Sequence, residues 1–227
     1  MKKLNKLFGT VIILAVIMTA TQSCKKKELG MTITLKMKTT SVTVPQKALA
    51  NTIEWTSGSV LIREIVFDGE LADGSSVSIT HEQLSEIDLI TGTATPEINV
   101  VIPAGEYTDV NLGIEIQDEN DVPSVIAEGT YTDASNNTTP IRFEFNSGEV
   151  FEADFDSVVF DTNTAPTAVI DFNPSIWFSV VTSEMLDSAE RINGVILVNE
   201  TYNTDIFSIV ADKLDDATEG DFELEDD

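Results

Sequence analysis

Carboxylates are the side chains of this chain best suited to chemistry, because acidic residues outnumber basic residues by 39 to 13. Carboxylate oxygens bind hard cations, and calcium takes about six to eight oxygen ligands. In the stretch ADFDSVVFD (153–161), Asp154 and Asp156 alternate with apolar residues, so they would lie on one face of a strand. The pair is a candidate calcium site, although in a chain this acidic the favoured interpretation is solvated surface acids.

A second acidic stretch, QDENDVP (117–123), resembles the linker motif of cadherins, in which acids bind calcium. The resemblance implies ligand roles for Asp118, Asn120 and Asp121. The second asparagine of that motif is replaced by Val122, and cadherin sites also need acids from a neighbouring repeat. Calcium therefore stays open as a ligand, and no other cofactor is expected.

The residues that catalysis near neutral pH most often uses are scarce. His81 is the one histidine and Cys24 is the one cysteine. A histidine base needs an orienting acid and a nucleophile, and the chain has no G-x-S-x-G elbow. The same scarcity argues against zinc and copper sites. We therefore expect a protein that is not an enzyme, with His81 in a surface loop.

The N-terminus has the order of an export signal. Lys2, Lys3 and Lys6 precede an apolar run from Leu7 to Ala20. This run is shorter than the ~20 residues of a settled transmembrane helix, and charge, apolar core and small residues follow each other as in a signal peptide. An uncleaved anchor helix and a signal with an incidental cysteine are the alternatives.

The signal ends at Cys24 in the sequence TQSC, which resembles a relaxed lipobox, the cleavage site of bacterial lipoprotein precursors. The resemblance implies removal of residues 1–23 and lipidation of Cys24. Two letters, Thr21 and Gln22, depart from the strictest form of the motif. Each buried lipid methylene contributes about 0.8 kcal/mol, and a stable anchor needs more than one chain. We expect a protein that a lipid anchors to a membrane.

If the chain is exported, carbohydrate binding is a further option, since exported β proteins can stack an exposed aromatic ring on a sugar. Trp177 lies in the apolar run SIWFSVV and is expected in the core. Trp55 has polar neighbours in IEWTSG, so it is the candidate ligand residue. The favoured interpretation of Trp55, however, is an anchor on an edge strand.

The charge is distributed unevenly along the chain. The formal net charge is −26, and all acidic residues follow residue 27. A body this acidic repels phosphate backbones, so we expect no nucleic-acid partner. The last thirteen residues, 215–227, contain eight acids, and such a block is usually a disordered, solvated tail.

The expected organisation is a signal peptide over 1–23, a lipidated tether over 24–30, a β domain with C-terminal helices over 31–214, and the tail. Apolar and polar residues alternate over 32–38, 110–116, 141–146 and 151–156, which is typical of strands with one face in water. The runs 60–67 and 98–103 are apolar on nearly both sides and are expected as central strands. With turn residues between these runs, the pattern predicts a mainly β fold, an antiparallel β-sandwich.

Two short helices are expected near the C-terminus. Over 182–194, Thr182 or Ser183 is the expected cap and Gly194 the expected end. Over 203–217, the apolar positions are spaced by three and four residues: Ile206, Ile209, Val210 and Leu214. We expect this stripe to pack on the sheet edge, with a partner-binding helix as the alternative.

Four segments together resemble a domain of unknown function in Bacteroidota-type lipoproteins: SVLIREIVFDGE, SEIDLITG, VVIPAGEYTDVNLGIEI and ADFDSVVFD. The resemblance covers roughly residues 31–180, and IPAGEY is its most specific part. It implies an immunoglobulin-like or transthyretin-like sandwich with no established activity. Periplasmic copper-handling lipoproteins share the order of these motifs, but they depend on imidazole or soft ligands that this chain nearly lacks.

These observations predict a non-catalytic, lipid-anchored cell-envelope protein that acts as a structural or protein-interaction module. A carbohydrate- or calcium-binding surface lipoprotein is the alternative. The expected partners are the membrane, through the lipid anchor, and an envelope protein or a glycan. In the resembling lipoproteins an acidic run after the cysteine often marks export to the outer surface. Because KKKE follows Cys24 here, the periplasmic side of the outer membrane is favoured over the cell surface.

Overall fold

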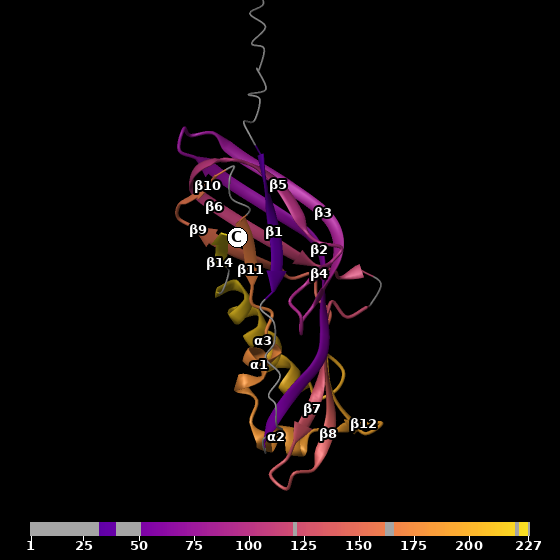
Figure 1. Cartoon of the computed structure of the whole chain (residues 1–227). Helices are drawn as coiled ribbons and strands as arrows, with labels where there is room; N and C mark the ends of the chain where they lie inside the picture. Colours follow the sequence, from indigo (N-terminus) through magenta and orange to yellow (C-terminus); the bar gives the residue numbers. More distant parts are fainter. Residues whose placement is uncertain (1–31, 40–50, 120–121, 162–165, 221–222, 227) are drawn as a thin grey trace, which may run out of the picture.

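Strands form most of the regular structure, as the alternating patterns predict. The structure is a computed structural model that describes residues 32–39, 51–119, 122–161, 166–220 and 223–226 (Figure 1). The first strands are β1 (Thr32–Thr39), β2 (Thr52–Leu71), β3 (Ser76–Asp88), β4 (Ala94–Thr95), β5 (Asn99–Pro103), β6 (Gly105–Ile116) and β7 (Val125–Thr132). The later strands are β8 (Thr138–Phe145), β9 (Val150–Phe155), β10 (Val158–Phe160), β11 (Pro166–Ile170), β12 (Arg191–Ile192), β13 (Val195–Val198) and β14 (Glu223–Asp226).

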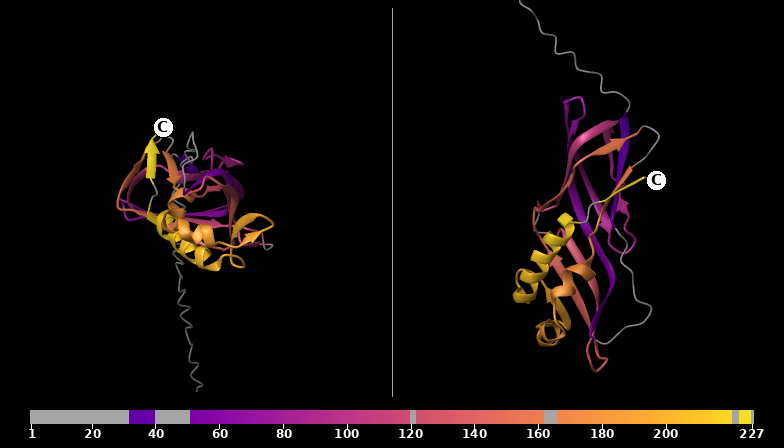
Figure 2. Two further views of the ribbon diagram at one scale, coloured as in Figure 1. Left: turned by 90° about the horizontal axis from the view of Figure 1, so that it is seen from below. Right: turned by 90° about the vertical axis from the view of Figure 1, so that its left-hand side faces the viewer.

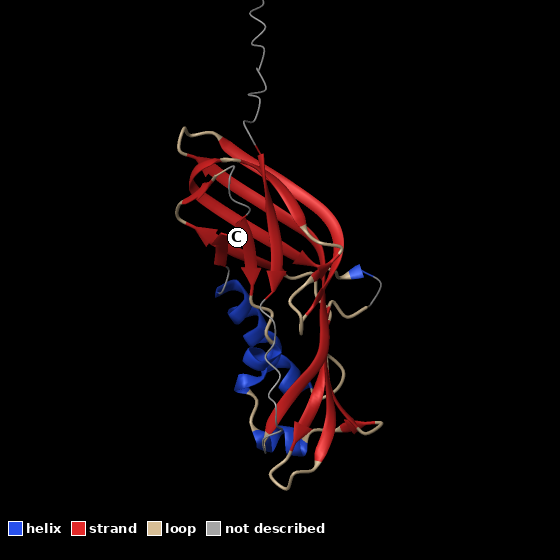
Figure 3. Cartoon of the chain, viewed as in Figure 1, coloured by secondary structure: helices blue, strands red, loops and turns tan. Residues whose placement is uncertain are grey.

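Apart from a 3-10 turn at Glu119, the helices of the described residues follow β11 along the chain. They are α1 (Pro174–Trp177), the 3-10 helix η2 (Phe178–Val180), α2 (Ser183–Ser188) and α3 (Thr204–Gly220). Figure 3 shows them in blue on one side of the lower half of the molecule. None of the helices in the described residues is both long enough and apolar enough to cross a membrane.

The strands form two sheets. One has four strands in the order β14-β11-β1-β5, and the other has ten, with the central path β10-β6-β2-β7-β8-β13-β12. Within the described residues, most pairs are antiparallel, but β1 pairs with β11 in parallel and so does β13 with β8. The antiparallel expectation therefore holds for most pairs but not for these two. Parallel neighbours need long crossovers, and the segment between β8 and β13 provides one that includes α1 and α2.

The 20-residue strand β2 runs through both halves of the molecule (Figure 1). At its C-terminal end it lies between β3 and β6, and at its N-terminal end it pairs with β7. Figure 2 shows the four-stranded sheet over the half of the molecule in which β2 lies between β3 and β6. The helices lie against the other half, which contains β7 and β8. The run 60–67, expected as a central strand, is the middle of β2.

The other run expected to be covered on both faces behaves differently. Val100 and Ile102 are fully buried, whereas Val101 between them is 55% exposed. The strand β5 stands at the edge of the four-stranded sheet, with β1 as its neighbour there. The expectation of a central strand at 98–103 is therefore wrong, because only one face of β5 meets the core.

A continuous buried cluster joins both sheets and the helices. Phe151 of β9 packs edge-on against Phe172, which follows β11, with ring centroids 5.5 Å apart. Trp177 is fully buried, as expected, but in α1 rather than in a strand. The start of this helix carries its own sequence signal, since Asn173 accepts a hydrogen bond from the Ser175 backbone N–H and Pro174 occupies the first turn.

The helix expected over 203–217 is confirmed as α3, which buries Ile206, Val210 and Leu214. The helix expected over 182–194 begins at the predicted cap, Thr182, but α2 ends at Ser188. The reason is the Asn193–Gly194 pair, both at positive φ, which turns β12 into β13 as a tight hairpin.

The acidic stretch 215–227 was expected to be disordered. The structure instead places Asp215 and Asp216 in α3, where the neighbouring Ala217 and Thr218 are buried. After Gly220, β14 pairs with β11 in antiparallel register. Burial of the small residues on one face of α3 gives this acidic segment its regular structure.

Candidate functional site

An extended array of charged side chains lies on the face of β3, β2, β6 and β9 that points away from the core. We call this surface the outer face. Its strand register defines four rows of neighbouring positions, which are Glu82–Glu64–Glu115–Val150, Thr80–Val66–Gly113–Glu152, Ser78–Asp68–Asn111–Asp154 and Ser76–Glu70–Asp109. Eight of these positions are acidic and none is basic.

Like charges oppose one another directly in these rows. Glu64 of β2 lies between Glu82 of β3 and Glu115 of β6, and Glu70 lies opposite Asp109. Such pairs destabilise a sheet. At one corner Arg63, the extra residue at a β-bulge, approaches Glu115 with its Nη1 3.4 Å from Oε1. The guanidinium therefore compensates one edge of the outer face and leaves Glu70 and Asp109, farther along β2 and β6, facing each other.

The centre of the outer face is apolar. A Cβ built on Gly113 would lie 3.7 Å from Val150 Cγ1 and 3.8 Å from Val66 Cβ, so these three residues are neighbours. Val150 is 44% exposed. Apolar atoms in the middle and charged groups at the rim are the usual arrangement of a protein interface.

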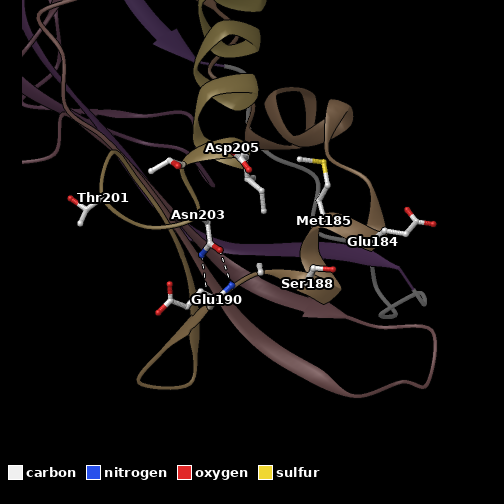
Figure 4. A pocket seen from close by; sticks show the side chains of 10 residues that line it. Glu184, Met185, Ser188, Glu190, Thr201, Asn203 and Asp205 are labelled. Atoms are coloured by element: carbon white, nitrogen blue, oxygen red, sulfur yellow. Dashed lines mark hydrogen bonds between the residues drawn. The ribbon is translucent and has the colours of Figure 1, made fainter.

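A hollow of about 620 Å³ lies at the far end of the molecule, between α2, the segment that leads into β12, and the first turn of α3 (Figure 4). Its lining contains three carboxylates together with polar and apolar residues: Glu184, Met185, Ser188, Ala189, Glu190, Thr201, Asn203, Thr204, Asp205 and Ile206. Acceptors of this kind suit the hydroxyls of a sugar.

The Asn203 side chain links two of the segments around the hollow by hydrogen bonds. Its Nδ2 donates to the carbonyls of Glu190 and Leu197 at 3.0 and 2.7 Å, and its Oδ1 accepts from the Glu190 N–H at 2.7 Å (Figure 4). Asn203 adopts φ +52°, a conformation in which asparagine is favoured. The sequence pattern places Asn203 at the start of the expected helix 203–217, but its contact with Glu190 depends on the β12–β13 hairpin, which the pattern did not predict.

Tyr131 of β7 fixes α2 on the sheet. Its ring is 1% exposed and its hydroxyl donates to Asp187 Oδ1 at 3.0 Å. Burial first, and then the hydrogen bond to the Asp187 carboxylate, raise the pKa of Tyr131 to about 12. The neutral phenol is therefore the form that the fold requires.

The calcium candidates are placed apart. Asp154 is on the outer face and accepts a hydrogen bond from Asn111 Nδ2 at 2.9 Å. Asp118 follows the end of β6 and lies 3.6 Å from Arg63 Nη1, and Asp156 is exposed beyond β9. Asn120 and Asp121 fall outside the described residues. Within the part of the chain that the structure describes, no group of three His, Cys, Asp or Glu residues could hold a metal ion.

The aromatic candidate is not exposed. Trp55 is 2% exposed and packs edge-on against Phe178 of η2, with ring centroids 4.9 Å apart. The structure therefore excludes Trp55 as an exposed ligand residue, because η2 covers this end of β2. His81 was expected in a loop but lies within β3, half-buried opposite Ile65. Cys24 falls outside the described residues, as do the signal peptide and the tether.

No protein-family model matches this chain, and the comparisons with curated proteins and with solved structures found no match either.

Proposed function

We propose that this protein is a non-catalytic, lipid-anchored protein of the cell envelope that docks a protein partner. The anchor is Cys24, and the periplasmic side of the outer membrane is the favoured location. The proposal includes membership of the Bacteroidota-type lipoproteins that the sequence resembles. It also takes the two sheets as layers of a β-sandwich, which the packing of Phe151 on Phe172 supports.

The placement of the chain's first strand carries the proposal. Cys24 precedes Thr32, where β1 begins, by eight residues. Eight residues span at most about 28 Å even when fully extended, so a lipid on Cys24 keeps this end of β1 near the membrane. Figure 1 shows β1 beginning at the end of the molecule opposite α2 and β12. The long sides and the far end of the body are thus presented to the surrounding compartment.

The test is the removal of the proposed lipid attachment. Cys24→Ala is expected to move the protein from the membrane fraction to the soluble fraction of the envelope, because a chain without the diacylglyceryl group loses its anchor. Leu84→Ala, at an exposed position on β3, is the matched control and stays in the membrane fraction. Retention of the Cys24→Ala protein in washed membranes contradicts the proposal.

A second candidate function is the binding of a carbohydrate or of calcium. The hollow favours the binding of a carbohydrate, because carboxylate, amide and hydroxyl groups line a space of about 620 Å³ there. A ligand that binds the folded protein raises its melting temperature. Thermal melting of the full chain with millimolar calcium, and separately with envelope glycans, tests this function. Melting temperatures that neither addition changes rule it out.

A further inference from the structure

We propose that the outer face is the docking surface, and that its occupant is a basic protein surface with an apolar centre. This inference rests on the proposed function, a docking module, and adds where the partner binds and what its chemistry is. Lysine or arginine side chains of the partner would lie between the carboxylates of neighbouring strands. An apolar side chain of the partner would contact Val66 and Val150.

The first step in the argument is the unfavourable charge arrangement of the free protein. Glu64 has a carboxylate neighbour on each side, in β3 and in β6. Directly opposed like charges destabilise a sheet, and a serine or threonine would fit the same positions without that effect. A basic partner reverses the sign of the interaction, because each added cation is attracted by at least two carboxylates at once.

The second step is the shape and size of the surface. Four strands about 4.8 Å apart and four rows about 6.8 Å apart give a patch of roughly 15 by 20 Å between its outermost backbone positions. Side chains that extend beyond these positions enlarge it toward the smaller docking interfaces. The apolar positions form a contiguous strip from Val66 and Gly113 in the middle of the face to Val150 at its β9 corner. A partner can therefore exclude water from this strip while its charges pair with the carboxylates beside it.

The third step separates this partner from other occupants. Phosphate backbones and anionic lipid headgroups carry the same sign as the outer face and are repelled by it. A single divalent ion would not cover the apolar centre. A protein surface supplies both the cations and the apolar contact, so it fits the whole face.

The experiment uses the full acylated chain in its own cells, with a photo-reactive phenylalanine analogue at Thr80. Thr80 is exposed on the outer face in the same row as Val66. The expected result is a covalent adduct with one protein, in which the cross-linked peptide is rich in lysine or arginine. The triple variant Glu64→Gln, Glu82→Gln and Asp68→Asn is expected to lower the adduct yield by about tenfold, because it removes the facing charges.

A matched control removes the same charge at the other end of the molecule. Glu184→Gln, Glu190→Gln and Glu200→Gln change three exposed acids at or beside the hollow. This control is expected to leave the adduct at Thr80 unchanged. The triple variant of the outer face is also expected to raise the melting temperature by about 2 °C or more, because it relieves repulsion. A lower melting temperature contradicts the first step.

Three results would overturn the inference. One is an adduct at Thr80 that persists in the outer-face variant, and another is an adduct lost equally in the control variant. The third is an adduct that forms with the analogue at Thr201 in the hollow and not at Thr80. Membrane release of Cys24→Ala is scored separately, so failure of the anchor and failure of the docking surface are distinguishable.

Discussion

At the scale of single residues, Trp55 shows how burial decides between two roles. The local sequence gives it polar neighbours, yet the ring packs against Phe178 and is 2% exposed. Trp55→Ala is expected to lower the free energy of unfolding by about 3–5 kcal/mol, because it leaves a cavity in the core. Urea unfolding measures this loss, with Leu84→Ala within about 0.5 kcal/mol of the unchanged protein as the control. A stable Trp55→Ala protein would return Trp55 to the list of candidate ligand residues.

Tyr131 makes a prediction for alkaline pH. Because burial and Asp187 raise the pKa of Tyr131 to about 12, the folded state keeps the phenol neutral while an unfolded chain would begin to ionise near pH 10. The stabilisation is fully present below pH 10 and is lost as the pH rises toward 12. Tyr131→Phe is expected to lose about 1 kcal/mol at neutral pH, through its hydrogen bond to Asp187, and to flatten this alkaline decline.

Denaturant melts of both proteins at pH 8, 10 and 11.5 measure the effect. The difference in the free energy of unfolding between the unchanged protein and Tyr131→Phe should shrink as the pH increases. A difference that is constant across this range contradicts the assigned role of Tyr131.

At the scale of elements, the link between the β13–α3 loop and β12 depends on Asn203. Its side chain makes three hydrogen bonds, and its φ of +52° is a conformation that costs most residues about 1 kcal/mol or more. Asn203→Ala is expected to lose both contributions, whereas Asn203→Gly loses only the hydrogen bonds. The free energy of unfolding should therefore be highest for the unchanged protein, lower for Asn203→Gly and lowest for Asn203→Ala, with about 1 kcal/mol between the two variants. The reverse order of the variants would show that backbone strain at this position is negligible.

The same region shows what the sequence could and could not predict. The spacing of Ile206, Val210 and Leu214 predicts α3, since a helix with this stripe must bury it. Asn193 and Gly194 are a strong hairpin signal, but Ile192 also continues the apolar stripe of the preceding helix. Local pattern alone could not decide between these readings. The decision comes from β8, with which β13 pairs, more than 50 residues earlier in the chain.

The candidate surfaces likewise depend on pairing between segments that are distant in the sequence. The alternating pattern predicts that β6 and β9 carry polar residues on one face, and Asp154 is one of them, whereas the run 60–67 of β2 was expected to be apolar on nearly both sides. The outer face exists because the register aligns Glu64 with Glu82 and Glu115. Register depends on turns, on the bulge at Arg63 and on pairing between distant segments. The rows of the outer face could therefore not be predicted from any single stretch of the sequence.

At the scale of the whole molecule, net charge is the dominant electrostatic feature. The formal net charge of the full chain is −26 at pH 7, so the carboxylates of the folded protein repel one another, and added salt screens this repulsion. The melting temperature is expected to rise by about 2–5 °C between 10 mM and 500 mM sodium chloride. The outer-face triple variant should show a smaller rise. Equal responses would mean that the repulsion is spread evenly over the surface rather than concentrated in the four rows.

The account of the whole molecule depends on its anchor, because the anchor sets the compartment and determines which surfaces meet a partner. Intact-mass analysis of the native protein, extracted from membranes, measures this directly. The expected result is a chain that begins at Cys24 and carries a diacylglyceryl group on sulfur and an acyl group on the new N-terminus. A chain that begins at Met1, or a Cys24 thiol that reacts with an alkylating reagent, would contradict it.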